Sequence, residues 1–390
     1  MKKETQKNST PRVIIVLIFI LSFYGGAIYY IAARSYQGIT LFSFNINPFI
    51  YAGVFIFLAV SIMIRFFPIP YGIKRFIDTI GSYWIGFFVY LLIFFLLSDI
   101  VILLGRVTTL IESPVPQVIR FWSFLMVFLL TSGLMIYGKC NAVKIRHVSY
   151  EVQLKNSSLT KELKIVMIAD LHLGVTDGEK YLPQIVKGIN DLEPDIVCIT
   201  GDIFNDDLFL IRNLDATMEL LRSIKTKYGV YACFGNHDGG STFNDMVRFL
   251  EKSNVVLLND EHVVVDGRLI LIGRLDARPI RGYGDFKRAD IADVVASIDA
   301  NANLPIIVMD HDPSHIMEYG NEFDLLLFGH THNGQLFPGN IIVSAIFTAK
   351  YGYYQKTPDS PHVIITSGVS TWGTPVRIGT KNEIVSILMR

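Results

Sequence analysis

Histidines and carboxylates directly follow apolar runs in the second half of the chain. The stretch LLLFGHTHNG (325–334) ends its apolar run with His330 and His332, one residue apart. In an extended strand, residues i and i+2 point to the same face, so both imidazoles are expected to face one point. Asp170 and His172 in IADLHLG repeat this spacing. Such pairs are typical of metal ligands, although a polar strand end with incidental histidines is the alternative for either pair alone.

Three further stretches place similar groups after apolar runs. Because ligands of α/β sheets gather at the carboxyl ends of strands, we expect all five stretches to meet. Imidazole, carboxylate and carboxamide ligands without thiolate suit Mn, Fe, Zn or Co. These ligands are more than one tetrahedral ion needs. Two ions could instead bind the attacking and the leaving oxygen during a displacement at phosphorus. The additional groups are Asp202 in TGDIFND, Asn236 and His237 in FGNHDGG, and His311 in MDHDPSH.

The ordered set of motifs resembles the signature of the calcineurin-like metallophosphoesterases. Asp-x-His, Gly-Asp, Gly-Asn-His-Asp, His and Gly-His-x-His occur in that order, and the resemblance covers about residues 160–390. It implies a four-layer αββα sandwich and two divalent metal ions. It also implies that His237 faces the phosphoryl group and the leaving oxygen and is not a metal ligand. By the same resemblance, one ion is held by Asp170, His172, Asp202 and His332, and the other by Asp202, Asn236, His311 and His330, with Asp202 bridging.

The C-terminal stretch SGVSTWGTPVRIGTKNEIVSILM (367–389) is similar to a membrane-attached or exported bacterial branch of this family. That branch includes enzymes of the UDP-diacylglucosamine pyrophosphatase type. Asn205 stands where many members have an aspartate that orients the catalytic histidine. An asparagine can still hold a histidine by a hydrogen bond but stabilises imidazolium less, and Asp206 or Asp238 could compensate for the lost carboxylate. Asn382 stands where the branch usually has proline, and we expect this difference to be neutral.

The composition predicts a membrane protein. Of the 390 residues, 51% are hydrophobic and only 18% are charged, which is too apolar for an ordinary soluble protein. The net charge is zero, so nucleic-acid binding is not expected. The apolar residues concentrate before residue 140. A membrane-spanning helix needs about 20 apolar residues, and four segments are predicted to span, namely 13–33, 48–64, 80–105 and 121–138.

Basic residues predict the orientation of these spans. They are denser in the N-terminal tail, between the second and third spans, and after the fourth span than in the other loops, which places both termini in the cytoplasm. We therefore predict a multi-pass protein of the inner (cytoplasmic) membrane with a cytoplasmic catalytic domain. The predicted parts are a tail (1–12), a transmembrane bundle of four helices (13–140), a linker with the first strand (141–159) and the phosphoesterase domain (160–390).

The hydrophobic pattern changes to alternating strands and helices from about residue 145. Near-continuous apolar runs such as LKIVMIAD (163–170) are typical of strands buried on both faces. The segments form an α/β domain that is large enough for a core of its own. Strands are predicted at 145–154, 163–170, 195–200, 229–234, 262–273, 304–310, 323–329, 362–367 and 383–389, and helices near 179–192, 212–226, 242–252 and 288–299.

A basic loop, GRLDARPIRGYGDFKR (273–288), is predicted to contact the substrate. Its arginines suit phosphate oxygens, and Tyr283 or Trp372 could stack on a base or sugar. The alternative is an ordinary solvated loop. The residues predicted to bind substrate are Arg274, Arg278 and Arg281.

Together these features predict a membrane-anchored dinuclear-metal phosphoesterase. The bond is expected to be a phosphodiester or pyrophosphate, in a phosphorylated and lipid-linked or nucleotide-linked substrate. A different class of function, a membrane sensor or scaffold with a degenerate phosphoesterase domain, stays open, although the complete ligand set argues against it. A transport role for the spans is disfavoured because they lack clustered ionisable residues.

Overall fold

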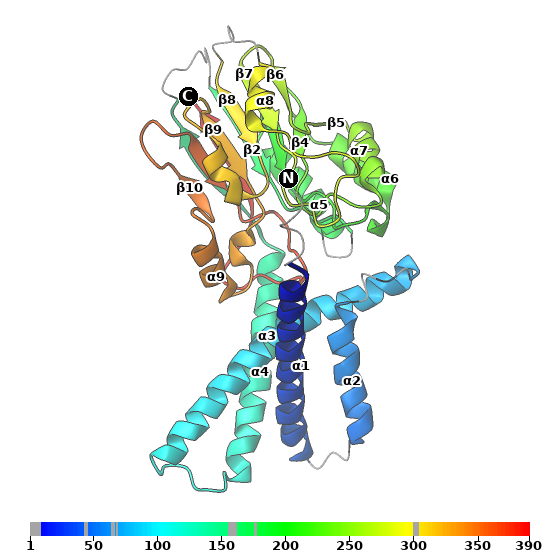
Figure 1. Ribbon diagram of the computed structural model, residues 1–390, viewed down its shortest axis with the longest axis vertical. Helices are drawn as coiled ribbons and strands as arrows, with labels where there is room; N and C mark the ends of the chain where they lie inside the picture. The colour runs from blue at the N-terminus through cyan, green and yellow to red at the C-terminus, as the bar shows by residue number, and fades with distance from the viewer. Residues whose placement is uncertain are drawn as a thin grey trace. The chain divides into compact units, whose positions relative to one another are not determined.

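The computed structural model describes residues 9–42, 46–63, 67, 69–154, 162–174, 178–298 and 304–390, with side chains from residue 14 onward. The chain divides into two compact units, Met1–Ile136 and Tyr137–Arg390. The first unit is helical and the second is an α/β domain (Figure 1).

The helical unit contains four apolar helices, of which three are long enough to cross a membrane. The second predicted span is therefore wrong in its length. Asn47 caps that helix at its start by accepting hydrogen bonds from Phe49 and Ile50, and the helix ends at Ser61 after 14 residues. Its length of about 21 Å is short of the roughly 30 Å hydrocarbon core. The helices are α1 (Ser9–Thr40), α2 (Pro48–Ser61), α3 (Tyr71–Val107) and α4 (Gln117–Ala142), the last of which continues into the second unit.

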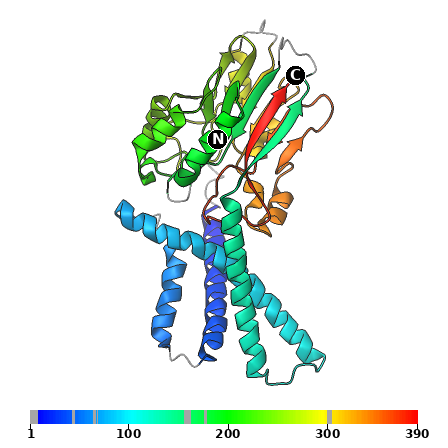
Figure 2. The same cartoon turned by 180° about the vertical axis from the view of Figure 1, so that it is seen from behind.

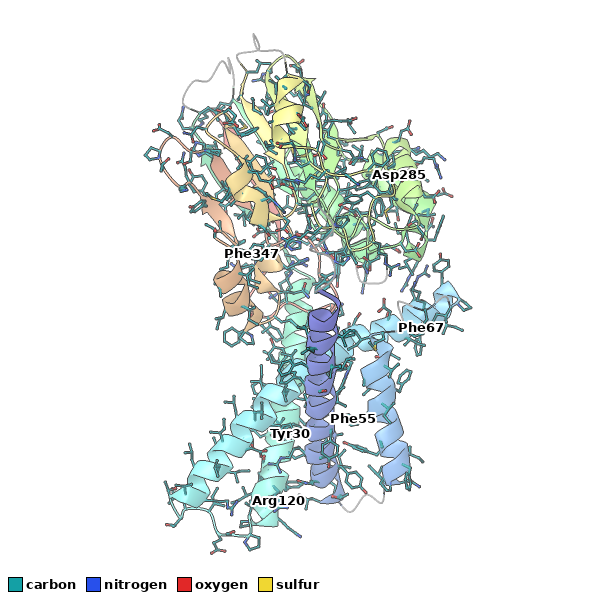
Figure 3. The ribbon with its side chains drawn as sticks, viewed as in Figure 1. Tyr30, Phe55, Phe67, Arg120, Asp285 and Phe347 are labelled. Atoms are coloured by element: carbon teal, nitrogen blue, oxygen red, sulfur yellow. The ribbon has the colours of Figure 1, made fainter. Side chains whose placement is uncertain are left out.

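Contacts between the helices fix their directions. The Tyr24 hydroxyl donates to the Ala59 carbonyl and the Tyr51 hydroxyl to the Ala32 carbonyl, so α2 runs antiparallel to α1. The ring of Tyr24 packs on Phe88, and Tyr30, labelled in Figure 3, donates to Asp99 at 2.6 Å. Arg34 forms an ion pair with the same carboxylate. Thus α1 and α3 run in the same direction, and the short α2 returns the chain between them.

The second unit contains two six-stranded sheets. Strand β12 lies between β1 and β2, parallel to the first and antiparallel to the second (Figure 2). The first sheet has the order β1-β12-β2-β3-β4-β5 and the second the order β10-β11-β9-β8-β7-β6. Their bounds are β1 (Ile145–Val152), β2 (Leu163–Ile168), β3 (Ile196–Thr200), β4 (Val230–Cys233), β5 (Val255–Leu257), β6 (Glu261–Val265), β7 (Leu269–Gly273), β8 (Ile306–Met309), β9 (Leu325–Phe328), β10 (Gly352–Tyr354), β11 (His362–Ile365) and β12 (Asn382–Met389).

Three hydrophobic layers show that this domain is an αββα sandwich, as predicted. Residues such as Met167 and Leu327 pack between the two sheets. Val166 and Ile185 belong to the layer between the first sheet and its helices, and Val308 and Val294 to the layer outside the second sheet. The helices are α5 (Gly178–Asp191), α6 (Leu214–Arg222) and α7 (Phe243–Lys252) over the first sheet, with α8 (Ile291–Ala296) over the second.

Three elements of the domain were not predicted. The strands β5 and β10 have three residues each, too few to show a period. Helix α9 (Gly339–Ile346) begins with Gly-Asn after a proline and buries none of its residues, so it lacks the amphipathic pattern of a core-facing helix.

Candidate metal centre

The predicted ligands lie in loops that follow strands of both sheets. Asp170 and His172 follow β2, and Asp202 follows β3. His330 and His332 follow β9, but the chain is not extended there, so the predicted reason for their shared face is wrong. Five of the predicted ligands adopt positive φ angles, which cost roughly 1–3 kcal/mol each and persist only where the surroundings enforce them. They are Asp170 (57°), His172 (45°), Asp202 (50°), His330 (69°) and His332 (47°).

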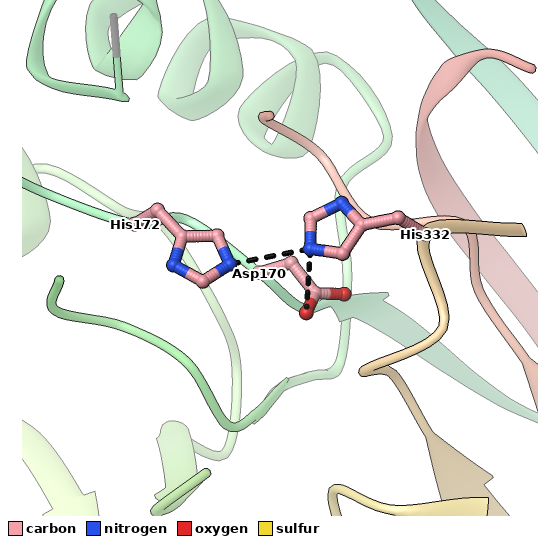
Figure 4. A group of neighbouring side chains, drawn as sticks. All are labelled: Asp170, His172 and His332. Atoms are coloured by element: carbon pink, nitrogen blue, oxygen red, sulfur yellow. Dashed lines mark hydrogen bonds and ion pairs between the residues drawn. The ribbon is translucent and has the colours of Figure 1, made fainter. Parts of the chain in front are cut away.

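Asp170, His172 and His332 form the first cluster (Figure 4). The Nε2 atoms of the two histidines lie 3.2 Å apart, and Nε2 of His332 lies 3.4 Å from Oδ1 of Asp170. All three side chains are buried. Two imidazole nitrogens and a carboxylate oxygen therefore converge on one small, dry space.

Asp202, His311 and His330 form the second cluster. Nε2 of His311 lies 3.1 Å from Oδ2 of Asp202, and Nδ1 of His330 lies 2.9 Å from Oδ1 of Asn236. His330 and Asn236 are half-buried, so this cluster is more open than the first. His330 and His332, one residue apart, thus contribute to different clusters.

Asp202 lies between the two clusters. Its Oδ2 atom is 3.1 Å from His311 and also 3.6 Å from Nε2 of His172 in the first cluster. Its Oδ1 atom accepts a hydrogen bond from the backbone of His237 at 2.9 Å. One carboxylate oxygen is therefore within reach of both candidate ion positions.

The donor atoms fit metal ions. Oδ2 of Asp170 is buried and has no hydrogen-bond partner among the described residues. Nδ1 of His311 donates to the Thr200 carbonyl at 2.9 Å, so Nε2, 3.1 Å from Oδ2 of Asp202, is the nitrogen that faces the cluster. A Cβ atom on Gly235 would lie 2.3 Å from Asp202, so only glycine lets this backbone approach the site. A carboxylate without a partner beside neutral imidazoles is the arrangement that a divalent cation completes.

Burial sets the charge state of these groups. It lowers the pKa of His172 to about 3 and that of His330 to about 4, so both imidazoles are neutral and able to bind a metal. It raises the pKa of Asp170 to about 7. Burial would also raise the pKa of Asp202, but His311 and His237 outweigh it and hold that pKa well below the usual range.

His237 is not a member of either cluster, although its ring centroid lies 5.2 Å from that of His172. Nδ1 of its ring lies 2.7 Å from Oδ1 of Asp206, so of the two candidates Asp206 supplies the orienting carboxylate. Asp238 instead accepts hydrogen bonds from the backbone of Phe204 and Gly235. Burial would lower the pKa of His237, but Asp202 and Asp206 together raise it above its ordinary value.

The predicted substrate loop divides into buried and exposed residues. Arg274 is 1% exposed and pairs with Asp260, so its predicted contact with substrate does not fit the structure. Tyr283 is buried and donates to the Gly235 carbonyl, which removes it as a stacking surface. Arg281 is exposed, and so is Arg278, which pairs with Asp312. The exposed aromatic residue Trp372 lies beside His237, with 5.7 Å between ring centroids.

Arg377 is a residue of the site that the sequence did not identify. Its guanidinium is fully buried and donates to the carbonyls of His332, Ser367 and Ser370. One of its nitrogens lies 3.1 Å from Nδ1 of His332. Burial lowers the pKa of Arg377 to about 10, so it stays charged at neutral pH. A charged residue in the apolar sequence TPVRIG was the available signal.

Comparison with known proteins agrees with these observations. Residues 163–334 match the calcineurin-like phosphoesterase family. A Campylobacter jejuni protein described as an uncharacterized metallophosphoesterase is 28% identical over 388 residues, covering 96% of this chain and 99% of that protein. A Danio rerio "transmembrane protein with metallophosphoesterase domain" is 28% identical over 326 residues, covering 78% of this chain and 72% of that protein. Both similarities extend into the helical segment.

Proposed function

Because residues 163–334 match the calcineurin-like phosphoesterase family, we propose that the chain is a membrane-anchored, dinuclear-metal hydrolase of phosphodiester or pyrophosphate bonds. The observation that supports two ions is the position of Asp202. Its Oδ2 atom lies 3.1 Å from a histidine of one cluster and 3.6 Å from a histidine of the other. A carboxylate in this position serves two cations at once, and two ions would polarise the phosphoryl group and activate the attacking water.

The remaining polar groups suit this reaction. His237, held by Asp206, would protonate the leaving oxygen, since its ring is not part of either cluster. A raised pKa keeps its proton available near neutral pH. Trp372 would cover the leaving group, because its half-exposed ring lies against His237.

Arg278 and Arg281 are proposed to hold the substrate's phosphate or sugar groups. The backbone of Ile280, between them, donates to the Asn236 carbonyl at 2.9 Å, so this loop is attached directly to the candidate metal centre. Both side chains are exposed, and a planar guanidinium matches two phosphate oxygens at once. Arg278→Ala and Arg281→Ala are expected to raise KM more than they lower kcat.

The domain is proposed to face the cytoplasm of a cell with an inner membrane. Because α2 runs back between the parallel helices α1 and α3, the start of α1 and the end of α4 are expected on one side. Lys139, Lys144 and Arg146 mark the end of α4, as the positive-inside rule requires of a cytoplasmic boundary. A reporter fused at residue 390 must be active in the cytoplasm, and an external reporter would overturn this assignment.

The alternative function is a non-catalytic sensor or scaffold. One experiment separates the two. The full chain in detergent is stripped of metal, reloaded with Mn²⁺, and assayed on an aryl phosphodiester, an aryl phosphomonoester and a nucleotide pyrophosphate. We expect about two ions per chain and hydrolysis of the diester or the pyrophosphate. Stoichiometric metal without turnover of any substrate would favour the scaffold.

A further inference from the structure

Helix α9 presents an unusual surface for an α/β domain. None of its residues is buried, although its sequence GNIIVSAI is almost entirely apolar. The larger side chains of this surface are Phe337, 50% exposed, with Ile341 at 58%, Ile342 at 60% and Ile346 at 68%. By contrast, α7 buries four residues, including Phe249 and Leu250, against the first sheet. The apolar side chains of α9 therefore have no place in the described core, and contiguous patches of this kind mark interaction sites.

This surface adjoins the candidate metal centre. The start of α9 packs on the loop that follows His332, where a Cβ atom on Gly334 would lie 2.3 Å from the Asn340 nitrogen. After the helix, the Lys350 carbonyl accepts a hydrogen bond from Thr331, the residue between the two histidine ligands, at 2.7 Å. The same lysine reaches back to the Asn340 carbonyl at 3.1 Å. Both ends of α9 are thus fastened to the His330–His332 segment.

The same surface is also fastened to the end of α4. The backbone of Phe337 donates to the Ile378 carbonyl at 2.9 Å, and Ile378 donates to the Gln335 carbonyl at 3.0 Å. Next to it, the backbone of Arg377 donates to the carbonyl of Gly138, a residue of α4 within this unit, at 3.0 Å. Since α4 is a candidate membrane span that ends at Ala142, the segment before α9 is bonded to the last turns of that candidate span.

We propose that Phe337 and α9 form a membrane-docking surface that inserts into the boundary between lipid headgroups and acyl chains. A helix whose isoleucine side chains are exposed suits that boundary, because the apolar face of such a helix is buried between headgroups and acyl chains. Docking of this surface would present the metal centre to the phosphates of lipid-linked molecules. That consequence rests on the proposed function, but the docking does not.

Lipid quenching of a fluorescent label tests the docking directly. The exposed Cys140 is replaced by serine in the full chain, and the buried Cys198 and Cys233 are kept. Ile342→Cys is labelled with bimane in vesicles of phosphatidylcholine and phosphatidylglycerol that contain spin-labelled lipid. The matched control is Val264→Cys, which is 48% exposed on β6, at the opposite edge of the second sheet from β10.

We expect spin labels on the upper acyl chain to quench the Ile342→Cys label strongly and the Val264→Cys label weakly. Equal quenching of the two labels would overturn the proposal. The proposal would also be overturned if the Ile342→Cys label were quenched only by a label on another copy of the protein. The surface would then be an interface between two chains.

Charged substitutions test the consequence for substrate access. Ile342→Glu with Ile346→Glu is compared with Val264→Glu on CDP-diacylglycerol in vesicles and on a soluble aryl phosphodiester. The α9 variant should lose about tenfold or more on the lipid probe alone, since one buried isoleucine is worth at least that factor. Equal loss on both probes would contradict lipid docking. A wild-type chain that cleaves neither probe would contradict the proposed function, and the quenching experiment would still decide the docking.

Discussion

The two candidate metal clusters are built from the same residue types but are held differently. The first cluster is buried throughout, and the charged guanidinium of Arg377 donates a hydrogen bond to the His332 carbonyl. The second cluster includes the half-buried His330 and Asn236, and the exposed arginine loop is attached to Asn236. The first cluster therefore lies deep in the scaffold, and the second is closer to the surface. Asp202, a member of the second cluster, also lies 3.6 Å from His172 of the first, and His237 belongs to neither.

Asp202→Asn should have the largest effect, because one side chain serves both clusters. We expect loss of both ions, with turnover falling to that of the metal-free protein. Metal content per chain after desalting, measured by plasma mass spectrometry, checks this. Retention of two ions would show that the clusters are independent of each other.

His237→Asn should separate catalysis from metal binding. Both ions are expected to stay, while kcat falls about 10²–10⁴-fold, the usual effect of removing a general acid. Aryl esters, whose leaving groups need little protonation, should lose less than alkyl esters. Equal losses on the two ester types would argue against the acid role, and loss of metal would place His237 among the ligands.

Much of the domain could be predicted because its strands are short, apolar and followed by polar ligands. The family motifs assigned His332 to one ion and His330 to the other, whereas the strand period alone placed both at one point. His330 and His332 were expected to face one point, yet their positive φ angles direct them to different clusters. Such backbone conformations depend on contacts made after the sheets assemble, and a strand period carries no information about them.

Other misses have the same cause. The burial of Arg274 depends on Asp260, fourteen positions earlier, and the role of Arg377 depends on its contact with His332. Neither partnership is visible as a local pattern. The length of α2 was missed because the apolar run continues past Ser61, where the helix ends.

Asp206→Asn should have a smaller effect than His237→Asn, because it changes only the support of that histidine. The carboxylate lies 2.7 Å from Nδ1 of His237 and stabilises its charged form, so its removal should lower kcat about 10–100-fold. The control is Asn205→Asp, which introduces a carboxylate at the neighbouring position. If Asn205→Asp raised kcat while Asp206→Asn had no effect, the orienting role would belong to residue 205.

Arg377→Met should have the smallest effect on turnover at saturating metal. It should have the clearest effect on the difference in metal affinity between the two clusters. Methionine replaces the apolar stem of the side chain but cannot donate to the His332 loop, so the first ion should bind about 10–100-fold more weakly, as is usual when a ligand's support is lost. Titration of stripped protein with Mn²⁺ should then show two separated steps, and activity should recover as metal is added. Arg278→Met, whose guanidinium is bound to Asp312 and not to a ligand, is the control and should leave both metal affinities unchanged. Thermal unfolding in chelator shows whether Arg377→Met has merely destabilised the fold. Equal weakening of the binding of both ions at an unchanged Tm would mean that Arg377 supports the whole centre. The two clusters would then differ only in their exposure to solvent.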